Sequence, residues 1–484
     1  MKIPQKGMDK AELLNTLEGF RANDVPWREG RAWGLLYDPG EEAEHVIKTA
    51  FTSYLTENAL DPTVFPSLLR FENEVVAMSI DHLNGDDDVV GTFTSGGTES
   101  IILATKSARD YYRDHKPEVT EPEVILPTTA HAAFHKAAYY LGLKVVNIPV
   151  DGTSFKADVA AMKEAITPNT IMIVGSACSY GHGVVDPIEE LGQVAIENDL
   201  WFHVDGCIGG FLLQYFRRLG ADVPLFDWRV PGVTSISMDL HKYAFAAKGA
   251  STVSYRSKKY RKYQMYACAN WTGYTIINST VQSTKSGGPI AAAWAAMNFI
   301  GDEGYLKMSE QMFNATRAIV DGLKNIEGIY LLGEPDMNLV AYASDDIDVF
   351  VLADRLKVRG WYVQPQLSFQ NSPANIHLSI NPAGEKWVEA LLKDTAECVA
   401  ELLAEKDEVK EPGTVEMMKA MLSTLKLEDL DDDAIEGMMG MVGVGGGDVP
   451  GDMAEINNIL DSIPPEVREK ILVAFFNEMF VATK

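Results

Sequence analysis

The chain has 484 residues, 46% hydrophobic and 23% charged, which is the profile of a globular enzyme with room for two or three domains. A net charge of −27 leaves no basic face to neutralise phosphates, so we expect no nucleic-acid partner. The four cysteines lack CxxC spacing, so neither disulfides nor a metal site are expected. Without a signal peptide or an apolar run of about 20 residues, the sequence predicts a cytoplasmic protein with no membrane span.

Residues 1–70 predict an N-terminal arm of helices and loops. Asp9 stands where it would cap a helix that runs through Leu13 and Leu17. Prolines then interrupt an extended stretch before a strongly periodic helix that includes Leu69. We expect the next segment, 71–305, to form a large domain.

A glycine turn, Ser95-Gly96-Gly97-Thr98, joins a short strand at 91–94 to a long amphipathic helix. Glycines at the start of a helix let backbone N–H groups approach an anion, and the helix dipole favours negative charge there. The two hydroxyls add donors, so the turn resembles a phosphate cradle. The alternative is an ordinary helix cap whose glycines serve only the turn.

Alternating strands and helices follow over about 200 residues and predict a doubly wound α/β domain with a largely parallel sheet. His131 and Asp205 each follow an expected strand, at the edge where such sheets bind ligands. An imidazole there can stack on an aromatic cofactor, and a carboxylate can pair with a protonated pyridine nitrogen. The alternatives are a structural histidine and a turn aspartate.

Lys242 lies just after an apolar segment, Val233 to Ser237, that is typical of a buried strand. Burial lowers the cost of the neutral amine, which attacks aldehydes to form a Schiff base. His-Lys after a strand is therefore a candidate attachment site for pyridoxal phosphate, whereas the plain alternative is a surface lysine.

These segments occur in an order that resembles one enzyme family. The matching stretches are TSGGTES, AHAAFHKAA, HVDGCIGGFL, DWRVPGVTSISMDLHKY and AAKGASTVSYRSKKYRKYQ, within roughly residues 30–400. The chain resembles the pyridoxal-phosphate-dependent group II decarboxylase family, most closely its sphingosine-1-phosphate lyases of the soluble bacterial type. The resemblance implies a fold-type I enzyme whose cofactor is pyridoxal 5'-phosphate, with 71–305 as the cofactor-binding domain.

The resemblance also implies roles for individual side chains. Lys242 would carry the cofactor, Asp205 would pair with its ring nitrogen, and His131 would stack on the ring. A second lysine, Lys248, would take part in catalysis. The remaining residues would bind the cofactor phosphate (Ser95, Gly96, Gly97, Thr98, His241 and, across a homodimer interface, Thr284) or the substrate (Tyr37, Asn58 and Asp61).

The segment from 279 to 288 is the one that the resemblance places at the partner's active site, so a homodimer with shared sites is expected. Lys285 stands where the lyases have an arginine, and it lacks the bidentate fork of a guanidinium.

Asp61 stands where the lyases have a histidine that helps to hold the substrate's phosphate. An ionised aspartate repels a phosphate dianion, so this position predicts a substrate other than a sphingoid phosphate, such as an uncharged, hydroxylated or cationic amino acid. The alternative is that Asp61 only caps the turn before Pro62.

The C-terminal part changes character twice. Residues 306–405 predict a smaller α+β domain, and 406–484 form an acidic, glycine-containing tail. The tail ends in an amphipathic segment, PEVREKILVAFFNEMF, which we expect to be a helix that docks on the body.

The residues and the resemblance together predict a lyase that breaks a carbon–carbon bond at the amine-bearing carbon of a small amino substrate, in the manner of an aldehyde-lyase. Two alternatives stay open at this point. One is an amino-acid decarboxylase that releases carbon dioxide, and the other is a cofactor-binding relic without activity.

Overall fold

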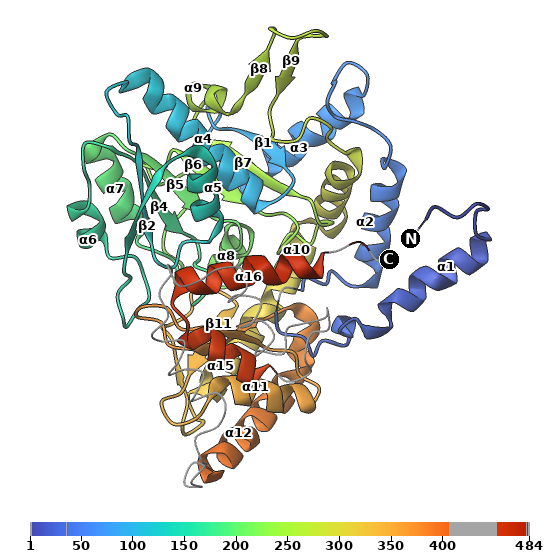
Figure 1. Ribbon diagram of the computed structural model, residues 1–484, viewed down its shortest axis with the longest axis vertical. Coiled ribbons are helices and arrows are strands. Elements are labelled where there is room, and N and C mark those ends of the chain that lie inside the picture. The colour runs from blue at the N-terminus through green and yellow to red at the C-terminus, as the bar shows by residue number, and fades with distance from the viewer. Residues whose placement is uncertain (1, 35, 406–452, 481, 483–484) are drawn as a thin grey trace.

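The computed structural model describes residues 2–34, 36–405, 453–480 and 482. It has a large domain built on a seven-stranded sheet and a smaller domain below it in the view of Figure 1. The large sheet has the order β1-β7-β6-β5-β4-β2-β3. Its strands are β1 (Val90–Thr94), β2 (Glu123–Pro127), β3 (Lys144–Ile148), β4 (Thr170–Ser176), β5 (Trp201–Asp205), β6 (Ser235–Met238) and β7 (Ser251–Tyr255).

The predicted α/β class with a largely parallel sheet is confirmed. Strands β3, β2, β4, β5 and β6 pair in parallel, and β7 runs antiparallel to both of its neighbours. Every residue of β2, β4, β5 and β6 is buried, which is expected where helices cover both faces of a sheet. The flanking helices are α4 (Gly97–His115), α5 (Ala133–Leu141), α6 (Val159–Glu164), α7 (Ile188–Asn198), α8 (Gly209–Arg218) and α9 (Lys258–Arg261).

The parallel arrangement determines where functional side chains gather. Strands β2, β4, β5 and β6 point the same way, so the residues that follow them meet at one edge of the sheet. His131, Asp205 and Lys242 come from three of these strand ends.

The smaller domain has an antiparallel sheet in the order β10-β11-β13-β12, and its core includes Trp361 and Leu378. Helix α10 runs from the large domain into this one as two helical stretches joined at Gly301, which is non-helical with φ at 62°. The expected domain boundary at 305 therefore falls inside a helix. The elements are α10 (Gly287–Leu323), β10 (Tyr330–Leu331), β11 (Leu339–Ala343), α11 (Val349–Val358), β12 (Gln364–Gln366), β13 (Asn375–Ser379) and α12 (Val388–Glu405).

The N-terminal segment is only partly an arm. Helix α1 (Lys10–Gly19) extends away from the body and buries no residue, and Asp9 caps it by accepting from the N–H groups of Ala11 and Glu12 (Figure 1). Further on, Trp33 is fully buried in the core of the smaller domain. Two helices, α2 (Glu41–Ser53) and α3 (Pro66–His82), pack against α10. A short hairpin, β8 (Tyr266–Cys268) and β9 (Ile276–Asn278), projects from the large domain (Figure 1).

The end of the chain forms two helices, α15 (Ala454–Ser462) and α16 (Pro465–Met479). Helix α15 packs on α11, and the Asp354 carboxylate accepts from the N–H groups of Met453 and Ala454 at its start. The predicted terminal helix is present as α16. The acidic and glycine-containing stretch at 406–452 lies outside the described residues. Within the described part of the chain, no helix is long and apolar enough to cross a membrane.

Candidate active site

A pocket of about 230 Å³ lies at the carboxyl edge of the parallel strands. It brings together four residues that the sequence singled out, Tyr37, His131, Asp205 and Lys242. The other lining residues come from the same strand ends, from the loop after β4 and from the smaller domain. They are Thr129, Ser176, Cys178, Tyr180, Cys207, Ile208 and Gln364.

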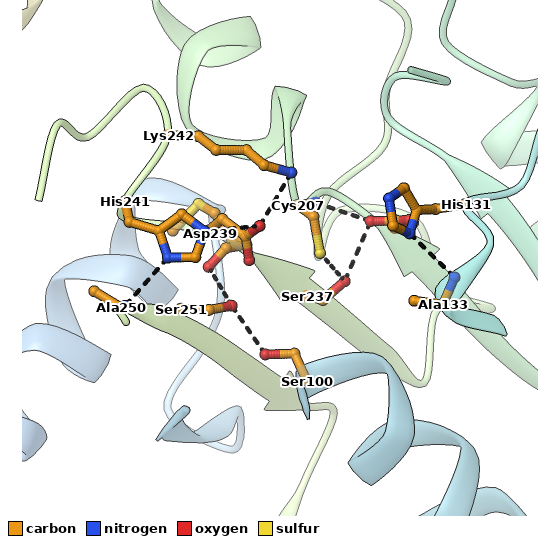
Figure 2. A network of polar contacts seen from close by, with 12 residues as sticks. Ser100, His131, Ala133, Cys207, Ser237, Asp239, His241, Lys242, Ala250 and Ser251 are labelled. Carbon is orange, nitrogen blue, oxygen red and sulfur yellow. Dashed lines mark hydrogen bonds and ion pairs between the residues drawn. The ribbon is translucent and has the colours of Figure 1, made fainter. Parts of the chain in front are cut away.

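Lys242 lies four residues after β6 and is held by an ion pair. Its Nζ is 3.1 Å from Oδ2 of Asp239, a buried carboxylate (Figure 2). Burial, the largest single influence, lowers the pKa of Lys242. The nearby acidic groups, chiefly Asp239 and with it Cys207, Tyr37 and Asp205, together outweigh burial, so the pKa is raised overall. Burial thus acts in the expected direction, towards the neutral amine, but the sequence argument did not weigh the carboxylate three residues earlier, which helps to reverse the net direction.

The glycine turn lies beside this ion pair. A Cβ atom at Gly97 would be 2.8 Å from Oδ2 of Asp239, so only glycine allows this approach. At Gly96 a Cβ would lie 3.4 Å from Cε1 of His241, which places the imidazole against the same turn. Nδ1 of His241 accepts from the Ala250 N–H at 3.2 Å, and burial lowers the pKa of this histidine.

A chain of hydroxyls fixes the turn relative to Lys242. The Ser251 hydroxyl donates to the Met238 carbonyl at the end of β6, and it lies 2.9 Å from the hydroxyl of Ser100 in the first turn of α4 (Figure 2). Ser100 in turn is 2.6 Å from Thr94 Oγ1 at the end of β1. The ends of β1 and β6 and the first turn of α4, which lie next to the glycine turn and Lys242 in the chain, are thereby held together.

Asp205 and His131 line the same pocket from the neighbouring strands. Oδ1 of Asp205 accepts from the Cys207 N–H at 3.0 Å, which orients the carboxylate at the end of β5. Nδ1 of His131 accepts from the Ala133 N–H at 3.1 Å, and Figure 2 shows Cys207 between His131 and Lys242. The imidazole is thereby held at one wall of the pocket.

Lys248 is exposed and lies outside the pocket lining, over the ring of Tyr37, which lines it. Its Nζ is 4.4 Å from the centre of the Tyr37 ring and donates to the His241 carbonyl at 3.0 Å. Partial loss of hydration at the amine, together with the charge of Lys242, lowers the pKa of Lys248 to about 8. This lysine can therefore exchange a proton near neutral pH, whereas burial raises the pKa of the Tyr37 phenol.

Four predicted residues line this pocket, and the glycine turn, His241 and Lys248 are outside the lining. Asn58, Asp61 and Thr284 do not line it either. Asn58 and Thr284 lie near each other, because Oδ1 of Asn58 accepts from the Lys285 N–H at 3.2 Å, and Asp61 is three residues past Asn58. Asp61 is exposed, and its carboxylate accepts from the N–H and the hydroxyl of Thr63, which is turn-capping geometry.

Lys285, discussed above as a replacement for an arginine, is buried. Its Nζ lies 2.8 Å from each carboxylate oxygen of Glu72. This amine is therefore occupied within its own chain and cannot offset a negative charge at Asp61.

Sequence reasoning missed the rest of the pocket. Thr129 lies just after β2 and Ser176 ends β4, much as His131 lies after β2 and Asp205 ends β5, so the strand-end rule could have identified them. Tyr180 lies four residues after β4, so the same rule extends to it. Gln364 carried no such signal, because its contact with Tyr180 depends on how the two domains pack.

The residues present fit pyridoxal 5'-phosphate. The buried oxygens Thr129 Oγ1, Ser176 Oγ and Asp239 Oδ1 have no hydrogen-bond partner among the described residues, so the site has polar groups to spare. The start of α4 offers N–H groups to a phosphate, and Ser95 and Thr98 are exposed beside it. An amine, a carboxylate and an imidazole surround the space where a pyridine ring would lie.

Comparison with known proteins agrees with this fit. Residues 36–344 match the model described as the pyridoxal-dependent decarboxylase conserved domain. The sphingosine-1-phosphate lyases of Arabidopsis thaliana and Oryza sativa are 41% and 40% identical, over 82% of this chain and 73% and 74% of theirs. The structure of a sphingosine-1-phosphate lyase from Burkholderia pseudomallei superposes with a TM-score of 0.80 and 33% identity, covering 84% of this chain and 93% of that one.

A second model, described as the C-terminal putative HTH domain of pyridoxal-dependent enzymes, matches residues 416–478. That segment carries 14 acidic and four basic side chains. Contacts with the phosphates of nucleic acid require an excess of basic side chains, which is the opposite balance. Together, the pocket and the matches show that the chain belongs to the pyridoxal-dependent decarboxylase family and is a pyridoxal-phosphate-dependent lyase of the aldehyde-lyase type.

Proposed function

We propose that the enzyme cleaves a phosphorylated long-chain amino alcohol, of the sphingosine-1-phosphate kind, into a long-chain aldehyde and a phosphorylated amine. The observation that carries this choice is the neutral wall formed by Tyr37, Tyr180 and Gln364. Among the described lining residues there is no arginine, so an α-carboxylate would find no guanidinium. This wall suits an amino alcohol better than the amino acid that a decarboxylase needs.

The residues divide the work of the reaction. Lys242 would hold the cofactor covalently, Asp205 would pair with its ring nitrogen, and His131 would stack on its face. When bound, the cofactor supplies an electron sink for the pair released from the broken bond. Lys248 would take the proton of the substrate's β-hydroxyl, the Cα–Cβ bond breaks, and Cβ leaves as the carbonyl carbon of the aldehyde. A proton returned to Cα completes the amine product.

Asp61 supports a second candidate. Its carboxylate, if it faces a neighbouring subunit's pocket, would favour an unphosphorylated hydroxylated amine. The turn-capping contacts with Thr63 support the first candidate instead, because they account for Asp61 without any ligand.

We further propose a cytoplasmic homodimer with shared sites and no nucleic-acid partner. The surface around Asn58, Asp61 and Thr284 would face the partner's pocket, since these residues do not line the pocket of their own chain. All four cysteines are free thiols, which supports a reducing compartment.

The test is a product assay on purified holoenzyme. Sphingosine-1-phosphate, unphosphorylated sphingosine and a panel of amino acids are supplied in parallel, and both aldehyde and carbon dioxide are measured. We expect aldehyde from the phosphorylated base and no carbon dioxide. Aldehyde from sphingosine alone would establish the second candidate, and carbon dioxide from an amino acid would overturn the proposal.

A further inference from the structure

Two pocket residues from different domains are joined by a hydrogen bond. Tyr180 lies in the loop after β4 of the large domain, and Gln364 opens β12 of the smaller one. The Tyr180 hydroxyl donates to Oε1 of Gln364 at 2.6 Å, and both side chains line the pocket. We call these two side chains the Tyr180–Gln364 pair.

The pair is held from behind by His377. The Tyr180 ring stacks on the His377 imidazole, with 4.4 Å between ring centres and 30° between planes. On β13, His377 is the direct register partner of Gln364. One fully buried side chain therefore supports both members, which limits their freedom to rotate.

The direction of the hydrogen bond leaves one amide group of Gln364 for a ligand. Burial raises the pKa of the Tyr180 phenol, so this hydroxyl stays protonated and acts as the donor. Oε1 of Gln364 is then the acceptor, and Nε2 carries two N–H groups. Among the described residues, none accepts a hydrogen bond from Nε2.

We propose that Gln364, oriented by Tyr180, donates a hydrogen bond to the substrate's hydroxyl on the carbon next to the amine-bearing carbon, and so selects hydroxylated amines. This inference rests on the proposed function, because that hydroxyl is the group from which the reaction starts. A neutral N–H suits an oxygen that is a hydroxyl in the bound substrate and gains negative charge as its proton leaves.

Selection follows from the cost of leaving a polar group unpaired. A site built to bond a substrate hydroxyl rejects the analogue that lacks it, because the site's own donor then has no partner. We therefore expect wild-type enzyme to prefer the hydroxylated ligand by about 10-fold or more.

The experiment compares two ligands on the holoenzyme. Sphingosine-1-phosphate and its analogue without the hydroxyl at the cleaved carbon are each titrated, with the change in cofactor absorbance as the readout for binding. We expect Gln364→Leu to bind both ligands alike, with unchanged affinity for the deoxy analogue. Gln364→Glu, which still accepts from Tyr180 but offers no N–H, should lose the preference too, and Tyr180→Phe should lose part of it.

The matched control is Gln366→Leu, the same substitution two residues along β12 and outside the pocket lining. It should keep the wild-type preference. A wild-type enzyme that binds both ligands equally, or a Gln364→Leu enzyme that keeps the preference, would overturn the inference. Failure of the proposed function looks different: the binding preference is present but wild-type enzyme releases no aldehyde.

Discussion

The two halves of the pocket are built in different ways. The cofactor half comes from successive strand ends of one parallel sheet, so His131, Asp205 and Lys242 meet by a rule of topology. The substrate half joins Tyr37 of the N-terminal segment, Tyr180 of a loop and Gln364 of the other domain. The first half is set by the sheet, whereas the second depends on how separate parts of the chain pack. We therefore expect the largest losses from the first half and changes of selectivity from the second.

The largest effect should come from Lys242→Ala. Without the attached amine, turnover should fall on the order of 10⁴-fold or more. Borohydride reduction of wild-type enzyme should fix the cofactor on the peptide that contains Lys242. The control is Lys248→Ala, which should still be labelled at Lys242. Label on Lys248 in the wild type would instead mean that Lys248 carries the cofactor and Lys242 does not.

The next effect should come from Asp205→Asn, which removes the anion expected at the ring nitrogen. Oδ1 can still accept from the Cys207 N–H, so the fold and cofactor binding should persist. We expect kcat to fall by about 10²- to 10³-fold. Circular dichroism and cofactor absorbance check that the variant is folded and loaded, and near-normal kcat in such a sample would refute the role.

Lys248 gives a pH signature at the border of the two halves. As a base it must be neutral, and its pKa of about 8 means that the active fraction grows as pH rises through 8. We expect kcat to rise over that range in the wild type. Lys248→Met should be slower by about 10²-fold and lose this rise. A pH profile that keeps its shape in the variant would exclude Lys248 as the base.

Thr284→Ala tests whether the cofactor half of the pocket is completed by a residue of the partner subunit. The loss of one hydroxyl contact should weaken cofactor binding by about 10-fold. Mixing this variant with Lys242→Ala should give more activity than either alone, because hybrid dimers contain one intact site. The shared-site proposal would be refuted if the activity of the mixture equals the sum of the two variants' separate activities. A fully active monomer in sedimentation would refute it too.

The smallest effect should come from Asp61→His. An exposed aspartate that caps its own turn should change the ratio of rates for phosphorylated and unphosphorylated substrates by less than about 3-fold. A shift above 10-fold toward the phosphorylated substrate would instead place Asp61 in the partner's site. Thr63→Ala is the matched control, since it disturbs the same turn without altering charge.

Sequence reasoning reached the sheet and the cofactor half because both follow from local patterns. Strand periodicity located β2, β4, β5 and β6, and polar residues directly after them indicated the site. It gave the effect of burial on Lys242 correctly but not the opposing charge of Asp239, because the approach of Asp239 depends on the tight turn after β6. It could not find Gln364, since nothing near that residue in the sequence records a contact with Tyr180, 184 positions away.

Glu99 gives the site a further property. One oxygen of its carboxylate accepts from the Ser95 N–H in the glycine turn at 2.7 Å, and the other accepts from the Val281 N–H at 2.8 Å. Val281 belongs to the segment that we propose reaches the partner. A single carboxylate thus spans the cofactor cradle and the proposed subunit contact. If cofactor binding strengthens the association of subunits, thermodynamic linkage requires that association strengthens cofactor binding by the same factor.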